Sequence, residues 1–156
     1  MGDVLIHEPS LDNIHTNSVS IDPKDGNVVI SNRNMDNVVK ISKETGEILW
    51  IFGGEYNQFD YNGMEPFSRQ HDAEFNEKGE LTLYDNGVEK ERGRGLIIDL
   101  DEDNKKVISY KEYIDDDQDG VSTGNIEEFG WNVLVNWGMW RKDPQFATIF
   151  NKRGKA

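Results

Sequence analysis

Four side chains in three separated segments could together bind an oxyanion and act on it. His15 and Asn17 stand in the run His-Thr-Asn-Ser, Arg33 follows Ser-Asn, and His71 stands in Gln-His-Asp-Ala. A guanidinium group can bind two oxygens of a sulfate or phosphate at once, and imidazole and carboxamide groups can donate further hydrogen bonds. One imidazole could also serve as a nucleophile or a proton carrier. These residue types therefore predict a local anion site.

The rest of the chain is strongly acidic. Its 156 residues include 17 Lys plus Arg against 30 Asp plus Glu, which gives a formal net charge of −13. Nucleic acid and anionic membranes are therefore poor partners, and an anionic substrate would need a local cationic pocket. Cysteine is absent, which excludes disulfides and thiolate metal sites. No stretch approaches the roughly 20 apolar residues of a membrane span, and the first residues lack the pattern of a signal peptide.

The elements that must position these side chains are short β-strands separated by turns rich in Gly, Pro, Asn and Asp. No window has a convincing helical period. The expected strands are residues 19–21, 28–31, 38–42, 48–52, 71–75, 81–85, 96–100, 107–110, 125–128, 133–137 and 146–150. Four-stranded units that recur at a period of roughly 50 residues predict an all-β fold, a β-propeller of four-stranded antiparallel blades.

The chain has room for about three blades, at approximately residues 15–52, 71–110 and 122–156, and the last lacks its fourth strand. We treat residues 1–156 as a single propeller segment. Propellers typically have 4 to 8 blades, so two interpretations stay open. The chain could be a segment of a longer propeller, which we favour. Alternatively, two copies could form a homodimer that closes the ring, with residues 4–6 of one copy completing the last blade of the other.

Short motifs follow one another in a consistent order over about residues 12 to 140. They are His15–Ser20, Ile30–Arg33, Val39–Ser42, Thr45–Trp50, Phe52–Gly54, Phe67–Ala73, Leu83–Gly87 and Arg94 leading into Ile98–Asp99. Together they resemble the bacterial arylsulfotransferase family. The resemblance implies a six-bladed propeller that transfers a sulfuryl group from a phenolic sulfate ester to a phenol through a sulfated histidine in the central channel. It implies no cofactor and no metal, and it suggests a periplasmic or secreted location.

The resemblance also assigns roles to individual residues. His71 matches the nucleophilic histidine, and His15 and Arg33 match residues that bind the sulfuryl group, with His15 as a candidate proton carrier. The expected substrate-binding residues are Asn17, Arg94 and Thr123. The family has a further active-site histidine on an earlier blade, and His7 lacks the surrounding pattern that would give it this role.

Each of these assignments has a structural alternative. A histidine on the first strand of a blade can be a hydrogen-bonded structural residue, and Arg33 could simply pair with Asp36 or Asp72. A second functional hypothesis is therefore a propeller fragment or divergent member that binds an anionic or aromatic ligand, or a protein partner, without turnover.

Three other sequence features have simple structural interpretations. Residues 115–120 begin like a calcium loop but lack Glu at the twelfth position, so we expect an acidic turn. Residues 85–87 form a turn signal, and residues 89–94 suggest an exposed loop from which Arg94 could face the channel. An aromatic cluster could line a substrate path, although packing between blades is the preferred interpretation for Trp137; its members are Trp131, Trp137 and Trp140.

Overall fold

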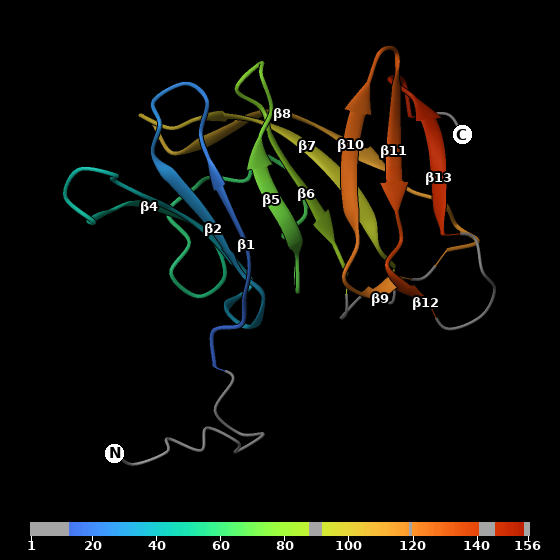
Figure 1. The fold of residues 1–156 in the computed structure, drawn as a ribbon, viewed down its shortest axis with the longest axis horizontal. Helices are drawn as coiled ribbons and strands as arrows, with labels where there is room; N and C mark the ends of the chain where they lie inside the picture. The colour runs from blue at the N-terminus through green and yellow to red at the C-terminus, as the bar shows by residue number, and fades with distance from the viewer. Residues whose placement is uncertain (1–12, 88–91, 119, 141–145, 155–156) are drawn as a thin grey trace, which may run out of the picture.

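A computed structural model describes residues 13–87, 92–118, 120–140 and 146–154. These residues form strands with one short 3-10 helix, so the all-β prediction is confirmed (Figure 1). The elements in chain order are β1 (Thr16–Ile21), β2 (Val28–Asn32), η1 (Arg33–Met35), β3 (Asn37–Ile41), β4 (Ile48–Gly53), β5 (His71–Phe75), β6 (Leu81–Asp85), β7 (Arg94–Asp101), β8 (Lys106–Tyr113), β9 (Gly120–Ser122), β10 (Asn125–Phe129), β11 (Asn132–Asn136), β12 (Met139–Trp140) and β13 (Ala147–Asn151). No helix in these ranges is long and apolar enough to cross a membrane.

Three antiparallel sheets stand side by side as successive propeller blades (Figure 1). The first has the strand order β1-β2-β3-β4, the second β5-β6-β7-β8, and the third β10-β11-β13. A separate ribbon pairs β9 with β12. Sequence patterns missed this ribbon because strands of two or three residues are too short to show an alternation.

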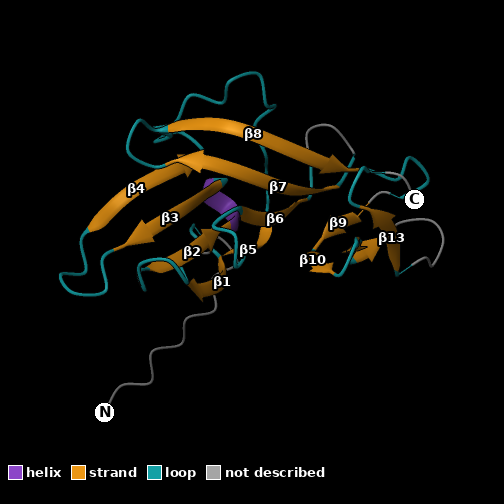
Figure 2. Cartoon of the chain, turned by 90° about the horizontal axis from the view of Figure 1, so that it is seen from above, coloured by secondary structure: helices purple, strands orange, loops and turns teal. Residues whose placement is uncertain are grey.

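Figure 2 shows β1, β5 and β10 along one side of the molecule and β4 and β8 along the other. The first strands of the three blades are therefore the inner ones. They all begin at the end of the molecule that lies lowest in Figure 1. This arrangement brings together residues near the starts of β1, β5 and β10, although they are far apart in the chain.

The first core lies between the first and second blades. Alternation along β6 places Leu81 and Leu83 in this interface, while Tyr84 faces the third blade. The first blade contributes Trp50 and Phe52, and residues 54–70 add Phe59, whose ring centroid lies 5.4 Å from that of Trp50. Burying one such aromatic side chain stabilises the fold by roughly 1.5–3 kcal/mol. The interface therefore holds the two blades in a fixed relation.

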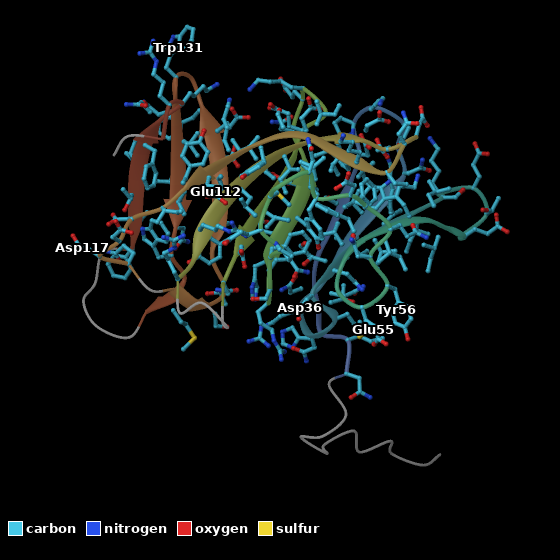
Figure 3. All side chains as sticks on the ribbon, turned by 180° about the vertical axis from the view of Figure 1, so that it is seen from behind. Asp36, Glu55, Tyr56, Glu112, Asp117 and Trp131 are labelled. Atoms are coloured by element: carbon cyan, nitrogen blue, oxygen red, sulfur yellow. The ribbon has the colours of Figure 1, made fainter. Side chains whose placement is uncertain are left out.

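The second core lies between the second and third blades. Trp137 is fully buried there against Tyr84 and Phe150, and its Nε1 donates a hydrogen bond to Thr148 Oγ1 at 2.9 Å. Trp137 is thus a packing residue, as preferred from the sequence. Trp131 differs, because it is 86% exposed at the tip of the β10–β11 hairpin (Figure 3). The Trp140 side chain lies outside the described part.

The acidic segment that resembles a calcium loop forms a turn after β8. The Asp115 carboxylate accepts hydrogen bonds from Thr148 Oγ1 at 2.8 Å and from the backbone N–H of Asp117 at 3.2 Å. The carboxylate therefore connects this turn to β13.

The first blade presents an apolar face on its side away from the second blade. Ser18 and Ser20 bond to Ala73 of β5, so the side chain of Val19, which lies between them in the strand, points the opposite way. Val19 is 67% exposed there. Both interpretations of the incomplete ring place another blade on this face. Measuring the mass of the protein in solution would distinguish a single chain from a two-chain ring.

Candidate active site

His71 is the first residue of β5 and only 8% exposed. Its Nδ1 lies 2.7 Å from Asn86 Oδ1 and 3.1 Å from the backbone oxygen of Arg69. Both partners are acceptors, so Nδ1 must carry the proton and donate it. In the neutral ring the unprotonated nitrogen is then Nε2, which is the form a nucleophilic histidine needs.

Burial lowers the pKa of His71 from its ordinary value of 6.5, and the nearby charges of Arg33 and His15 lower it further. The hydrogen bonds with Asn86 and Arg69 act in the opposite direction and do not cancel the lowering. The neutral imidazole is therefore favoured at neutral pH. These effects also place Arg33 and His15 within electrostatic reach of the His71 ring.

The backbone at the start of each inner strand adopts an unusual conformation. His15 has φ 51°, Asp72 has φ 58° and Thr123 has φ 60°. Positive φ is uncommon for residues other than glycine and is often found at functional sites. In β5 the effect is a bulge, since His71 pairs with Tyr84 while Glu74 pairs with Thr82. An extra residue there changes the direction in which the neighbouring side chains point.

Asn86 connects His71 to the third blade. It lies in the connection after β6 and is 1% exposed. Its Nδ2 donates to the backbone oxygen of Thr123 at 3.0 Å, which leaves Oδ1 as the group that accepts from His71. Sequence reasoning treated Asn86 only as part of a turn. A turn signal carries no information about this side-chain contact.

Arg33 and His15 lie on adjacent segments of the first blade. The backbone N–H of Arg33 donates to the His15 carbonyl at 2.9 Å, which continues the β1–β2 pairing past the ends of both strands. The Arg33 guanidinium donates to Asn34 Oδ1 at 2.8 Å. In the described part of the chain it forms no ion pair with Asp36 or Asp72, the partners considered from the sequence.

Asn17 and Gln70 join the two blades behind this site. Asn17 Nδ2 donates to the Gln70 carbonyl at 2.7 Å. The Gln70 side chain is fully buried, and its Nε2 donates to the Asn37 carbonyl at 2.8 Å. Gln70 was not singled out from the sequence, although it directly precedes His71. Its hydrogen bonds hold the start of β5 against the end of β2 and the start of β3.

Arg69 is a second residue that sequence reasoning missed. Its guanidinium donates to Asn34 Oδ1, the oxygen that also accepts from Arg33. Its backbone N–H donates to Asp36 Oδ1 at 2.6 Å, and Figure 3 shows Asp36 at the end of the molecule opposite Trp131. A lone arginine in a motif gives little signal, because its partners lie 33 and 35 residues away in the chain.

Arg94 lies apart from this group, in a buried network. It belongs to β7, is 3% exposed and does not lie on the exposed loop suggested by the sequence. Its Nε donates to Asp85 Oδ2 at 2.8 Å, its Nη1 donates to Glu112, and its Nη2 donates to the Glu65 carbonyl at 2.8 Å. The sequence pattern predicts that this strand begins at Leu96. In the structure β7 begins at Arg94, which pairs with Asp85 of β6.

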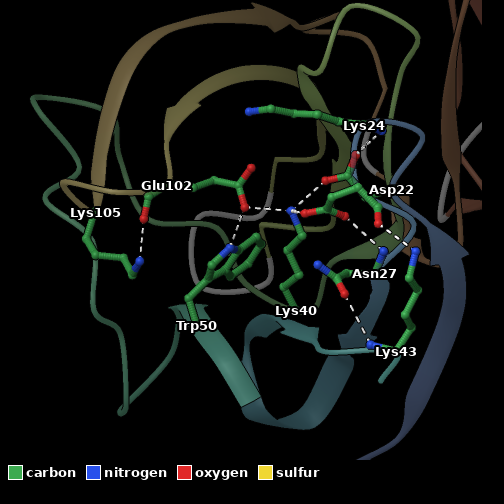
Figure 4. Close-up of polar contacts among 9 residues, drawn as sticks. Asp22, Lys24, Asn27, Lys40, Lys43, Trp50, Glu102 and Lys105 are labelled. Carbon is green, nitrogen blue, oxygen red and sulfur yellow. Dashed lines mark hydrogen bonds and ion pairs between the residues drawn. The ribbon is translucent and has the colours of Figure 1, made fainter. Parts of the chain in front are cut away.

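Lys40, near the C-terminal end of β3, is another buried cation. Figure 4 shows its side chain among carboxylates. Asp22, Asp25 and Glu102 are close enough together to share a metal ion. Lys40 Nζ occupies the space between them, at 2.6 Å from Asp22, 2.8 Å from Asp25 and 2.6 Å from Glu102. Burial by itself would lower the pKa of Lys40, but its hydrogen bonds with these carboxylates raise it. The ammonium group thus fills the position that a metal ion could take.

The inner end of the blades therefore brings together His15, Asn17, Arg33, His71 and the backbone of Thr123. The sequence model of the family described as Arylsulfotransferase (ASST) matches residues 6–142. The chain belongs to the arylsulfotransferase family. This assignment confirms the resemblance drawn from the motifs and supports sulfuryl transfer as the family-level activity, with phenolic compounds as the class of substrate. A comparison with curated protein sequences gives no match.

Within this arylsulfotransferase chain, the family match extends over the three inner strands on which the candidate residues lie. His7 also falls inside the matched range, but it lies outside the described residues.

Proposed function

We propose that this protein transfers a sulfuryl group from a phenolic sulfate ester to a phenolic acceptor, with His71 as the nucleophile and a sulfohistidine intermediate. The observation that carries the proposal is the pair of acceptors at Nδ1 of His71, Asn86 Oδ1 and the Arg69 carbonyl. They hold the proton on Nδ1 and leave the lone pair of Nε2 for attack.

In the first half of the reaction, the Nε2 lone pair of His71 attacks sulfur. A bond forms between Nε2 and sulfur as the bond between sulfur and the phenolic oxygen breaks. The phenolate leaves with the electron pair of that bond and takes a proton from His15. Arg33 holds two sulfuryl oxygens in its planar fork and stabilises the charge that builds on them.

In the second half, the acceptor phenol attacks the sulfur of sulfohistidine. His15, now neutral, takes the phenolic proton as the new bond between oxygen and sulfur forms. The bond from Nε2 to sulfur breaks, and its electron pair returns to Nε2. Because Nδ1 stays protonated throughout, the sulfated ring is cationic and is a good leaving group.

Asn17 and Thr123 have supporting roles in this proposal. One N–H of Asn17 Nδ2 bonds to the Gln70 carbonyl, and we assign the other to a sulfuryl oxygen. Thr123 contributes its exposed hydroxyl to substrate and its carbonyl to Asn86. Arg94 has another role, since its guanidinium is committed to Asp85, Glu112 and the Glu65 carbonyl. We assign it to holding the Asp85 end of the loop that carries Asn86.

The test is to incubate the protein with 4-nitrophenyl sulfate and phenol, follow release of 4-nitrophenolate, and map sulfation by mass spectrometry. We expect sulfation on His71, and we expect His71→Asn to lower transfer by about a thousandfold or more. His15→Gln is the matched control, because it also removes an imidazole but should leave His71 open to sulfation by the donor. A label that stays after His71→Asn, or binding of the donor without any transfer, would contradict the proposal. The second outcome would favour the non-catalytic ligand-binding alternative.

A further inference from the structure

Two guanidinium groups meet at one neutral oxygen beside the candidate active site. Arg33 comes from the turn between β2 and β3, and Arg69 comes from the segment before β5. Both donate through Nη1 to Oδ1 of Asn34, Arg33 at 2.8 Å and Arg69 at 2.5 Å. Both arginines are half-buried. Two positive charges are therefore held close together by the fold, with an amide oxygen between them.

No carboxylate of the described residues forms an ion pair with either guanidinium. The nearby Asp36 uses Oδ1 for the backbone N–H of Arg69. A guanidinium has five N–H donors, and the structure engages only Nη1 of each of these two side chains with described residues. The chain has a net charge of −13, yet these two guanidinium groups pair with no carboxylate of the described residues. We therefore infer that they are arranged for an anion from outside.

The two arginines differ in their relation to His71. Arg33 is one of the charges that lower the pKa of His71, so it lies within electrostatic reach of the ring. Arg69 places its carbonyl against Nδ1, the side of the ring opposite the attacking Nε2. Its guanidinium then extends to Asn34 in the first blade. Arg33 is thus positioned for the reacting group and Arg69 for a group farther along the substrate.

We propose that Arg69, beside Arg33, forms a second anion subsite that selects aromatic substrates carrying a carboxylate in addition to the sulfuryl group. This deepens the proposed function, on which it rests for the identity of the transferred group. The binding preference itself does not depend on turnover. It can therefore be tested even if His71 is not sulfated.

The experiment compares two sulfonates that cannot donate a sulfuryl group from oxygen. Benzenesulfonate carries one anionic group, and 3-sulfobenzoate carries a carboxylate as well. We expect isothermal titration calorimetry to give at least about tenfold tighter binding of 3-sulfobenzoate, as expected for one added charge-assisted contact. Arg69→Gln should remove this preference and change the affinity for benzenesulfonate by less than about twofold.

Three control variants test whether the preference comes from the Arg69 guanidinium. Arg69→Lys keeps the charge without the planar fork and should retain part of the preference. Lys111→Gln removes one exposed charge from β8 and should leave the preference unchanged. His71→Asn should abolish transfer and keep the preference, so failure of the proposed function and failure of the subsite give different results. Circular dichroism checks that each variant is folded.

Two results would overturn the subsite. The wild-type protein could bind the two sulfonates equally well, or Arg69→Gln could weaken both to the same extent. The second result would assign Arg69 to the sulfonate itself instead of the carboxylate.

Discussion

The two ends of β3 hold positive charge in opposite ways. At one end, Lys40 is 1% exposed and surrounded by three carboxylates, and Glu102 also accepts a hydrogen bond from Trp50 Nε1 at 2.7 Å. At the other end, the guanidinium groups of Arg33 and Arg69 share one amide oxygen and form no ion pair with a carboxylate of the described residues. An acidic chain has many carboxylates available. A cluster of cations that it leaves without them is therefore a better candidate for ligand binding than one that it neutralises.

Arg94 belongs with Lys40 in this comparison. Both are buried, and both bond to carboxylates from other segments of the chain. The sequence alone does not show that Arg33 and Arg94 differ in this respect, because both match residues of the family pattern. Their hydrogen-bond partners distinguish them, since Arg33 bonds to an amide oxygen and Arg94 to two carboxylates.

The largest difference should appear in stability. Lys40→Met leaves three carboxylates facing one another, and breaking a buried ion pair in this way costs about 3–5 kcal/mol. Arg69→Gln removes a half-buried cation without a carboxylate partner and should cost less than about 1 kcal/mol. Urea unfolding followed by tryptophan fluorescence measures both. Equal losses for the two variants would contradict the distinction between the two ends of β3.

The next effect concerns Asn86, which holds the proton of His71 on Nδ1. Asn86→Ala should lower kcat for 4-nitrophenyl sulfate by about 10- to 100-fold, because the ring loses its fixed tautomer. KM should change little, since Asn86 bonds to His71 and Thr123 and not to the substrate in this account. Asn86→Asp restores an acceptor and should recover part of the rate. A rise in KM with unchanged kcat would contradict a positioning role.

The smallest effect should be a displacement of the pH profile. His71 attacks only when neutral, so on the acid side the rate rises as pH passes upward through the pKa of His71. Because burial and the charges of Arg33 and His15 lower this pKa, the acid limb of the first half-reaction should lie below pH 6.5. Arg33→Gln removes one of these charges and should move the limb upward. A limb above 6.5 in the wild-type protein, or a downward movement in the variant, would contradict this.

Much of the fold followed from alternation and turn residues. The strands around Val29, Leu83 and Val133 lie where period-2 patterns predicted them, because each blade buries one or both faces against its neighbours. The ribbon of β9 and β12 was not predicted, and β7 begins two residues earlier than its apolar run. The ribbon and the early start of β7 depend on contacts with other parts of the fold and not on the alternation of apolar and polar residues.

The candidate site was only partly accessible from the sequence. His15, Asn17, Arg33 and His71 could be named from motifs, and the structure brings them to one end of the blades. The roles of Asn86, Gln70 and Arg69 could not, because they depend on hydrogen bonds to residues far away in the chain, such as His71 to Asn86 across 15 positions and Gln70 to Ser31 across 39. Arg94 shows the reverse case. A motif suggested substrate contact, and only the structure reveals the carboxylates that surround it.

The most direct test of the central claim is the protonation of the His71 ring. Long-range proton–nitrogen NMR on protein labelled with ¹⁵N-histidine distinguishes a protonated ring nitrogen from a bare one. The account requires a proton on Nδ1 and none on Nε2 at neutral pH, followed by a change at Nε2 when 4-nitrophenyl sulfate is added without acceptor. A resting ring with the proton on Nε2, or a donor that modifies Nδ1, would contradict the account.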